Sequence, residues 1–225
     1  MRGGRAKLPV LAELSGPLAG SDRVWSLRAA DLERLGAVRE RLDGHRAVLV
    51  TGAEESIGVL AVALAGVVAA EGRRTALLEC DLARPRLAAD LGLPQSPGLH
   101  EYLRWEATPP EILQPLVLAG PASAAAEEPL VCISAGRAAR DPATLLGLQS
   151  FRHMTAKLRG AYDLVVIAGP AIEAGGGSLP ALAAEADALL AAVGPGQPSG
   201  REGRELRAAV GRLSAAPLGA VVVKG

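Results

Sequence analysis

The sequence predicts an α/β fold in which a mostly parallel sheet is covered by helices on both faces. Short apolar runs alternate along the chain with longer segments of helical periodicity, an order that is typical of parallel sheets. The runs are continuously apolar, as strands buried on both faces must be. At 225 residues, of which 49% are hydrophobic, the chain can bury a full core. Because aromatic residues make up only 2%, that core must consist of Ala, Val and Leu.

Charge and composition exclude several classes of function. Lys+Arg and Asp+Glu are both 24, so the formal charge is zero and there is no global basic footprint for nucleic acid or an anionic membrane. Cys80 and Cys132 are expected to be buried, reduced thiols. The longest apolar stretch, residues 57–70, falls short of the about 18 residues that span a bilayer. We therefore expect a cytoplasmic protein without a transmembrane segment.

Three units are expected along the chain. Residues 1–24 contain glycine, proline and serine with weak periodicity, which predicts an extended N-terminal arm. Residues 25–44 have leucines at helical spacing and end at Gly44, which predicts an amphipathic helix capped by that glycine. Residues 46–225 form the α/β domain.

Within the domain, strands and helices can be assigned in order. Apolar runs predict strands at residues 47–50, 75–78, 130–134, 164–168, 188–193 and 218–223. A turn over residues 51–58 leads to a helix beginning near Val59, and further helices fit residues 143–160, 178–186 and 199–214. The proline- and glycine-rich region 93–128 is expected to hold short helical pieces at 99–105 and 110–116.

The turn after the first strand is the most informative segment. It reads Thr51-Gly52-Ala53-Glu54-Glu55-Ser56-Ile57-Gly58, and it joins a strand to an apolar helix as a phosphate-binding loop does. Such a loop requires Gly-Lys-Ser/Thr at the helix start, with the lysine on the β/γ-phosphates and the hydroxyl on Mg²⁺. This chain has Gly58-Val59-Leu60 instead. The scaffold is therefore recognisable, but the chemical residues are replaced.

One interpretation of this turn is a dinucleotide-binding loop. The string resembles the Thr-Gly-x-x-x-Gly-x-Gly of short-chain dehydrogenases, with Ser56 replacing the middle glycine. Glu79 or Asp81, after the second strand, could bind a ribose hydroxyl. That family also requires a catalytic Tyr-x-x-x-Lys, and neither Tyr102 nor Tyr162 is followed by lysine at that spacing. An NAD(P)-dependent dehydrogenase-like protein is therefore only the third interpretation.

The residues after the second strand favour a different family. They read Asp81-Leu82-x-Arg84-Pro85-Arg86-Leu87, then Leu91-Gly92-Leu93-Pro94 and Pro97-Gly98-Leu99-x-x-Tyr102-Leu103. This pattern, continued at residues 8–11, 162–167, 187–190 and 218–222, resembles the bacterial protein-tyrosine kinases of capsule and exopolysaccharide biosynthesis. Those kinases have a deviant P-loop and are related to septum-positioning and plasmid-partition ATPases. The resemblance covers most of the chain and implies a three-layer P-loop NTPase-like fold.

The resemblance also implies a nucleotide site in which most chemical residues are lost. The Walker A lysine falls on Val59, the Mg²⁺-binding hydroxyl on Leu60 and the Walker B aspartate on Ala168. Two carboxylates of an Asp-x-Asp motif remain, at Glu79 and Asp81, and these would hold the metal if the site were active. The degenerate positions are Glu55, Ser56, Gly58, Val59, Leu60, Glu79, Asp81 and Ala168.

These losses lead to a functional expectation. The family's Glu-x-x-Arg-x-x-Arg self-association motif falls on Asp31, Arg34 and Ala37, which predicts a monomer or weak homo-oligomer. We predict a catalytically degenerate kinase- or ATPase-like protein, without catalytic residues or cofactor, that regulates or scaffolds polysaccharide biosynthesis or export. The implied partner, a membrane-embedded polysaccharide chain-length regulator or an active kinase paralogue, would recruit it to the inner face of the membrane. The alternative is an active tyrosine kinase or ATPase that uses Mg-ATP in a rebuilt site.

Overall fold

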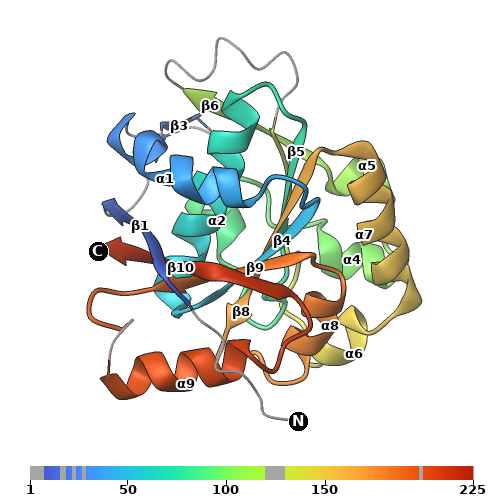
Figure 1. Ribbon diagram of the computed structural model, residues 1–225. Helices are drawn as coiled ribbons and strands as arrows, with labels where there is room; N and C mark the ends of the chain where they lie inside the picture. The colour runs from blue at the N-terminus through green and yellow to red at the C-terminus, as the bar shows by residue number, and fades with distance from the viewer. Residues whose placement is uncertain are drawn as a thin grey trace.

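The computed structural model describes residues 8–15, 19–21, 24–26, 29–119, 130–197 and 200–224 (Figure 1). Its strands are β1 Val10–Ser15, β2 Ala19–Ser21, β3 Val24–Ser26, β4 Ala47–Gly52, β5 Thr75–Glu79, β6 Gln114–Ala119, β7 Leu130–Ile133, β8 Leu164–Ala171, β9 Ala188–Val193 and β10 Ala216–Lys224. Its helices are α1 Ala29–Arg41, α2 Glu54–Ala70, α3 Leu87–Asp90, α4 Leu99–Leu103, α5 Pro109–Ile112, α6 Pro142–Leu146, α7 Gln149–Ala161, α8 Ser178–Ala184 and α9 Gly200–Val210.

The strands form one sheet in the order β1-β10-β9-β4-β8-β5-β7-β6-β3-β2. Along this spatial order, all pairings between neighbours from β1 through β10, β9, β4, β8 and β5 to β7 are parallel. By contrast, β6 runs antiparallel to β7, and β2 runs antiparallel to β3. The carboxyl ends of the central strands β9, β4, β8 and β5 therefore meet at one edge of the sheet. The mostly parallel α/β architecture predicted from the sequence is confirmed.

The core has two halves, one on each face of the sheet. Val48 and Val50 of β4 pack with α1 and α2, whereas Ala47 and Leu49 of the same strand pack in a cluster that includes Phe151 of α7. Helices α4, α6, α8 and α9 also contribute to the second cluster. This alternation explains why the central strands are continuously apolar: both faces are covered, and the fold has three layers.

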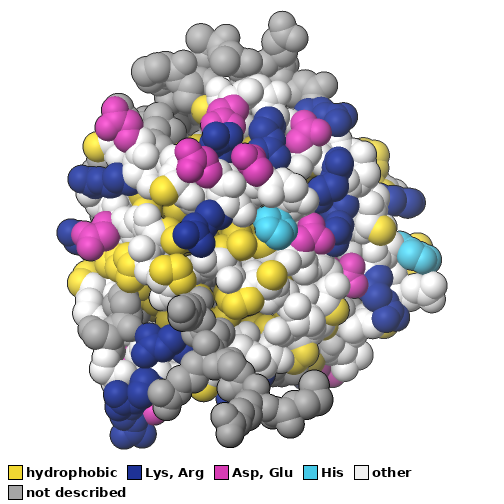
Figure 2. Space-filling model, in the orientation of Figure 1, with side chains coloured by type: hydrophobic (Ala, Val, Ile, Leu, Met, Phe, Trp, Pro, Cys, Tyr) yellow, Lys and Arg dark blue, Asp and Glu magenta, His cyan; other side chains and the backbone are white. Residues whose placement is uncertain are grey.

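The described helices include none that is long and apolar enough to cross a membrane. Helix α2, the most apolar, is buried along most of its length between the sheet and α1. Side chains of both charges are interspersed on the face shown in Figure 2, so that face has no uniformly basic stripe.

The N-terminal region differs from the sequence-based expectation. The segment predicted as an extended arm contributes β1, which pairs in parallel with β10 and buries Ala12 and Leu14. Helix α1 begins at Ala29 and not at Trp25, because residues 24–26 form β3 and pair with β6. Residues 1–7, 16–18 and 22–23 of the predicted arm lie outside the described residues.

The middle of the chain shows two further differences. The helix predicted over residues 143–160 is divided into α6 and α7, because Leu148 has an extended backbone conformation between them. The helical piece predicted over residues 110–116 ends at Ile112, after which residues 114–119 form β6 on the edge of β7. Elsewhere the six predicted strands are confirmed as β4, β5, β7, β8, β9 and β10.

Candidate functional site

The start of helix α2 differs most from the sequence-based expectation. The turn was predicted to extend to Gly58, but β4 ends at Gly52 and α2 begins at Glu54. Helix formation is favoured because residues 53–57 contain no glycine and because Glu54 and Glu55 lie at the positive end of the helix dipole. The Ser56 amide already donates to the Ala53 carbonyl, at 3.0 Å. A loop of free amides that converge on one ligand is therefore replaced by a helical turn.

Gly52 fixes this helix close to the sheet. Its φ is +143°, and a Cβ at this position would lie 1.9 Å from the Ala192 carbonyl oxygen of β9. The next amide, that of Ala53, donates to the same carbonyl at 2.8 Å, and the Gly52 carbonyl accepts from Ile172 at 3.0 Å. Only glycine allows the backbone to approach β9 so closely, so the start of α2 is held at the carboxyl edge of the sheet.

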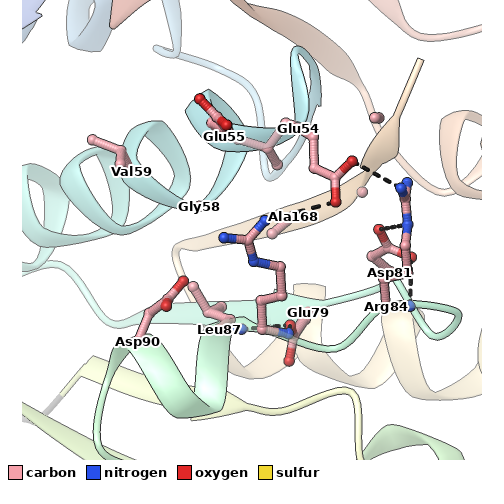
Figure 3. A pocket seen from close by; sticks show the side chains of 14 residues that line it. Glu54, Glu55, Gly58, Val59, Glu79, Asp81, Arg84, Leu87, Asp90 and Ala168 are labelled. Atoms are coloured by element: carbon pink, nitrogen blue, oxygen red, sulfur yellow. Dashed lines mark hydrogen bonds and ion pairs between the residues drawn. The ribbon is translucent and has the colours of Figure 1, made fainter. Parts of the chain in front are cut away.

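Glu54 forms ion pairs with two arginines of the β5–α3 loop. Arg84 Nη1 lies 2.8 Å from one carboxylate oxygen of Glu54, and Arg86 Nη1 lies 3.7 Å from the other. Arg84 also lies 3.8 Å from Asp81, so it joins Glu54 and Asp81 across the mouth of a cavity (Figure 3). The N-terminus of α2 thus carries a carboxylate, already bound by two guanidinium groups, where a phosphate would bind in a P-loop protein.

Beneath this bridge lies a small cavity of about 80 Å³. Of the predicted site positions, the structure brings six together in its lining: Glu55, Gly58, Val59, Glu79, Asp81 and Ala168. Ser56 lines a neighbouring, larger cavity, and Leu60 is fully buried in the core on the α1 and α2 face. Ligand cavities are usually about 300–1,000 Å³, so this one is too small for a triphosphate.

Glu79 is a buried carboxylate that is occupied by the backbone. One of its oxygens accepts from the amides of Arg86 and Leu87, both at 2.7 Å, and the other accepts from the Ala135 amide at 2.9 Å. Burial raises the pKa of Glu79, although these three donors oppose the shift. The side chain therefore joins the start of α3 to the end of β7.

Asp81 has a similar but weaker role. It accepts a hydrogen bond from the Arg84 amide at 3.1 Å, which closes the turn after β5, and partial burial raises its pKa. Within the described residues, no group of three or more His, Cys, Asp or Glu side chains could hold a metal ion.

A magnesium nucleotide requires cationic and metal-binding groups that these positions do not offer. Val59 is partly buried against the core, Leu60 is inside it, and Ala168 of β8 presents no carboxylate. The remaining acids, Glu79 and Asp81, are hydrogen-bonded to backbone amides. These predicted positions by themselves therefore do not fit the phosphates and metal of Mg-ATP.

A second cavity of about 760 Å³ lies on the other side of the Glu54–Arg84 ion pair, between the start of α2 and helix α9. It is lined by Glu173 after β8 and by Glu202 and Glu205 of α9, none of which the sequence singled out. Their pattern gave no signal, because exposed glutamates on a helix or loop usually belong to a solvated surface. The dehydrogenase candidates Tyr102 and Tyr162 line neither cavity.

No protein-family model and no curated protein matches the sequence. Solved structures do match. The chimerical protein CapA2B2 is 16% identical with a TM-score of 0.76, over 96% of this chain and 94% of that one. The kinase domain of the Escherichia coli tyrosine kinase ETK is 18% identical with a TM-score of 0.76, over 96% of this chain and 90% of that one.

A more distant match is cobyrinic acid a,c-diamide synthase from Mycobacterium smegmatis, solved with a bound ATP analog and magnesium. It is 21% identical with a TM-score of 0.55, over 79% of this chain and 72% of that one. At these identities the matches establish the fold. The chain has the P-loop NTPase-like fold of bacterial tyrosine kinase domains.

Proposed function

We propose that this chain is a catalytically degenerate relative of the polysaccharide-linked tyrosine kinases that regulates or scaffolds polysaccharide biosynthesis or export without binding nucleotide. Its partner is a membrane-embedded chain-length regulator or an active kinase paralogue, which recruits it to the inner face of the membrane. The eight degenerate positions, and the absence of a cofactor, are part of this proposal.

The observation that carries the proposal is the environment of Glu54. A carboxylate at the N-terminus of α2, bound by Arg84 and Arg86, occupies the region where the fold places phosphate. An incoming triphosphate would have to displace Glu54 from both arginines, and it would find no lysine at Val59. Charge-assisted hydrogen bonds contribute about 1.5–3 kcal/mol each, so the missing groups weaken Mg-ATP binding by several orders of magnitude.

The α1 motif supports a monomer or weak homo-oligomer. Asp31 is buried and accepts from the Ser15 amide at 3.2 Å, and Arg34 donates to the Ser15 hydroxyl at 2.7 Å and to Asp31 at 3.3 Å. The two residues that match the family's self-association motif thus hold α1 against β1 of the same chain. This internal use leaves less of the motif for contact with a second copy.

A second candidate is an active kinase or ATPase with a rebuilt site. It is favoured by the bound ATP analog and magnesium in the cobyrinic acid a,c-diamide synthase structure. In this chain the metal would have to bind Glu79 and Asp81 after they leave their backbone partners.

Isothermal titration calorimetry with Mg-ATP separates the two candidates. We expect no binding in the micromolar range to the wild-type protein. The matched pair of variants is Glu54→Gln, which removes the internal anion, and Glu55→Gln. Glu55 is the exposed neighbour of Glu54 and forms no ion pair with described residues. Micromolar binding that weakens in Glu79→Gln or Asp81→Asn would overturn the proposal in favour of the active enzyme. A tagged pull-down from native cells tests the partner, and recovery without any export-related protein would contradict the scaffold role.

A further inference from the structure

The larger cavity is in the position at which parallel α/β sheets bind ligands. It is lined by residues at the carboxyl ends of three adjacent strands, which are Gly52 at the end of β4, Ile172 after β8 and Gly194 after β9, and by residues of α9. In open parallel sheets, ligands bind outside the carboxyl ends of the strands. Its volume of about 760 Å³ lies within the usual range for ligand sites.

The lining of this cavity is strongly acidic. Five glutamates face two arginines, and these charged residues are Glu54, Glu55, Glu173, Glu202, Glu205, Arg84 and Arg212. Glu54 and Arg84 pair with each other, and Glu205 pairs with Arg201 at 2.7 Å. Within the part of the chain that the structure describes, Glu55, Glu173 and Glu202 form no ion pair. The excess of carboxylates repels phosphate and attracts cations.

The same cavity also has an apolar wall and a polar atom without a partner. Ile172, Val193 and Leu206 line it, so a ligand that fits must combine positive charge with aliphatic surface. Ser56 lines it too, is only 5% exposed, and its hydroxyl bonds to no described residue. Among the described residues, the buried side-chain atoms without a partner belong to His100 and Gln114. The Ser56 hydroxyl is therefore accessible from the cavity, where it can accept from an ammonium or guanidinium N–H.

We infer that this cavity binds a lysine- or arginine-rich segment of a partner protein. Long basic side chains lay their methylene stems on apolar surface and extend their charged ends to carboxylates, which matches both parts of the lining. Single metal ions would leave the apolar wall without contact. The inference deepens the proposed function by naming the chemistry of the partner, and it rests on that function only in requiring that no nucleotide occupies the cavity.

The test is fluorescence anisotropy with a short, fluorescein-labelled peptide of alternating arginine and leucine. A peptide of alternating glutamate and leucine, of equal length, is the charge control. We expect only the basic peptide to bind, and we expect Glu55→Gln and Glu202→Gln each to weaken it by about two- to fivefold. Glu33→Gln and Glu40→Gln on α1 remove exposed glutamates outside the cavity and should leave binding unchanged. Amide chemical shifts should change at Ser56, Ile172 and Leu206.

Each other outcome overturns the inference in a recognisable way. Equal weakening by the α1 variants would mean attraction to the whole surface and not to the cavity. Displacement of the peptide by spermidine at equal charge concentration would reassign the cavity to a free polyamine. If the protein binds neither the peptide nor Mg-ATP, this inference is wrong and the proposed function stays in place. Micromolar Mg-ATP binding that displaces the peptide removes the proposed function itself.

Discussion

Replacing Glu79 with glutamine tests whether this carboxylate holds the structure together or is kept for a metal. Glutamine retains one oxygen for the Arg86 and Leu87 amides, but its NH₂ group then faces the Ala135 amide. One buried N–H is left without an acceptor, which costs about 1–3 kcal/mol. Burial raises the pKa of Glu79 despite its three amide donors, so desolvation of its charge outweighs the stabilisation that those hydrogen bonds give to the ionised form. We therefore expect a loss in the lower half of that range, about 1–2 kcal/mol.

Urea denaturation followed by circular dichroism measures this loss, and a thermal melt should fall by about 2–8 °C. The matched control is Asp81→Asn. This carboxylate accepts one amide hydrogen bond in the turn and lies 3.8 Å from the Arg84 side chain at the surface, so its replacement should cost under about 1 kcal/mol. A metal-binding pair behaves in the opposite way, because removing one of two close carboxylates relieves repulsion in the metal-free protein. A Glu79→Gln protein as stable as the wild type, or more stable, would refute the structural role.

Two further predictions concern residues outside the cavities. Trp105 has φ +63°, and its side chain is 83% exposed. Trp105→Gly relieves about 1–2 kcal/mol of left-handed backbone strain and loses about 0.5–1 kcal/mol to the greater chain entropy of glycine in the unfolded state. The net change should raise the urea midpoint. Trp105→Ala keeps the strained backbone and should not raise it. Partial burial raises the pKa of Asp187, but hydrogen bonds from the Arg46 and Ala47 amides and from Arg159 outweigh it, so the pKa lies below its ordinary value. This stabilisation is present above the unfolded pKa of about 3.9 and is lost as pH falls through the folded pKa, so Asp187→Asn should flatten the acid limb of the stability curve. An acid limb as steep as that of the wild type would contradict this.

The central strands were predictable because their signal is local. Val48, Leu49 and Val50 are all buried. A short apolar run without polar residues is typical of a strand that is covered on both faces. The start of α2 was misplaced because comparison with phosphate loops predicted a turn, whereas the local preference of Glu54 and Glu55 for a helix N-terminus prevailed. Strand β1 was missed because it is an edge strand, specified by its neighbour β10 more than by its own residues, and β6 was missed because it depends on pairing with β7 and β3.

Most of the residues that line the smaller cavity were predictable from the sequence, but the ion pairs and hydrogen bonds among them were not. The comparison of motifs selected Glu79 and Asp81, and six of the eight positions do line one cavity. The sequence had no means of indicating that Arg84 would reach Glu54, which lies 30 residues earlier, because such contacts depend on how the strands are ordered in the sheet. The acidic lining of the larger cavity depends in the same way on the approach of α9.

The pairing of β1 with β10 has a consequence for the order of folding. Val10 lies beside Ala220 and Leu14 beside Val223, so the first described strand finds its partner in the last. During synthesis, residues 10–15 must remain without that partner until residues 216–224 have left the ribosome, while β4, β5 and β8 can already pair. Joining segments so distant in sequence is entropically slow. The docking of β1, together with the α1 contacts at Ser15, is therefore expected to be the closing event of folding, and the exposed edge of β10 is the surface most open to mispairing until then.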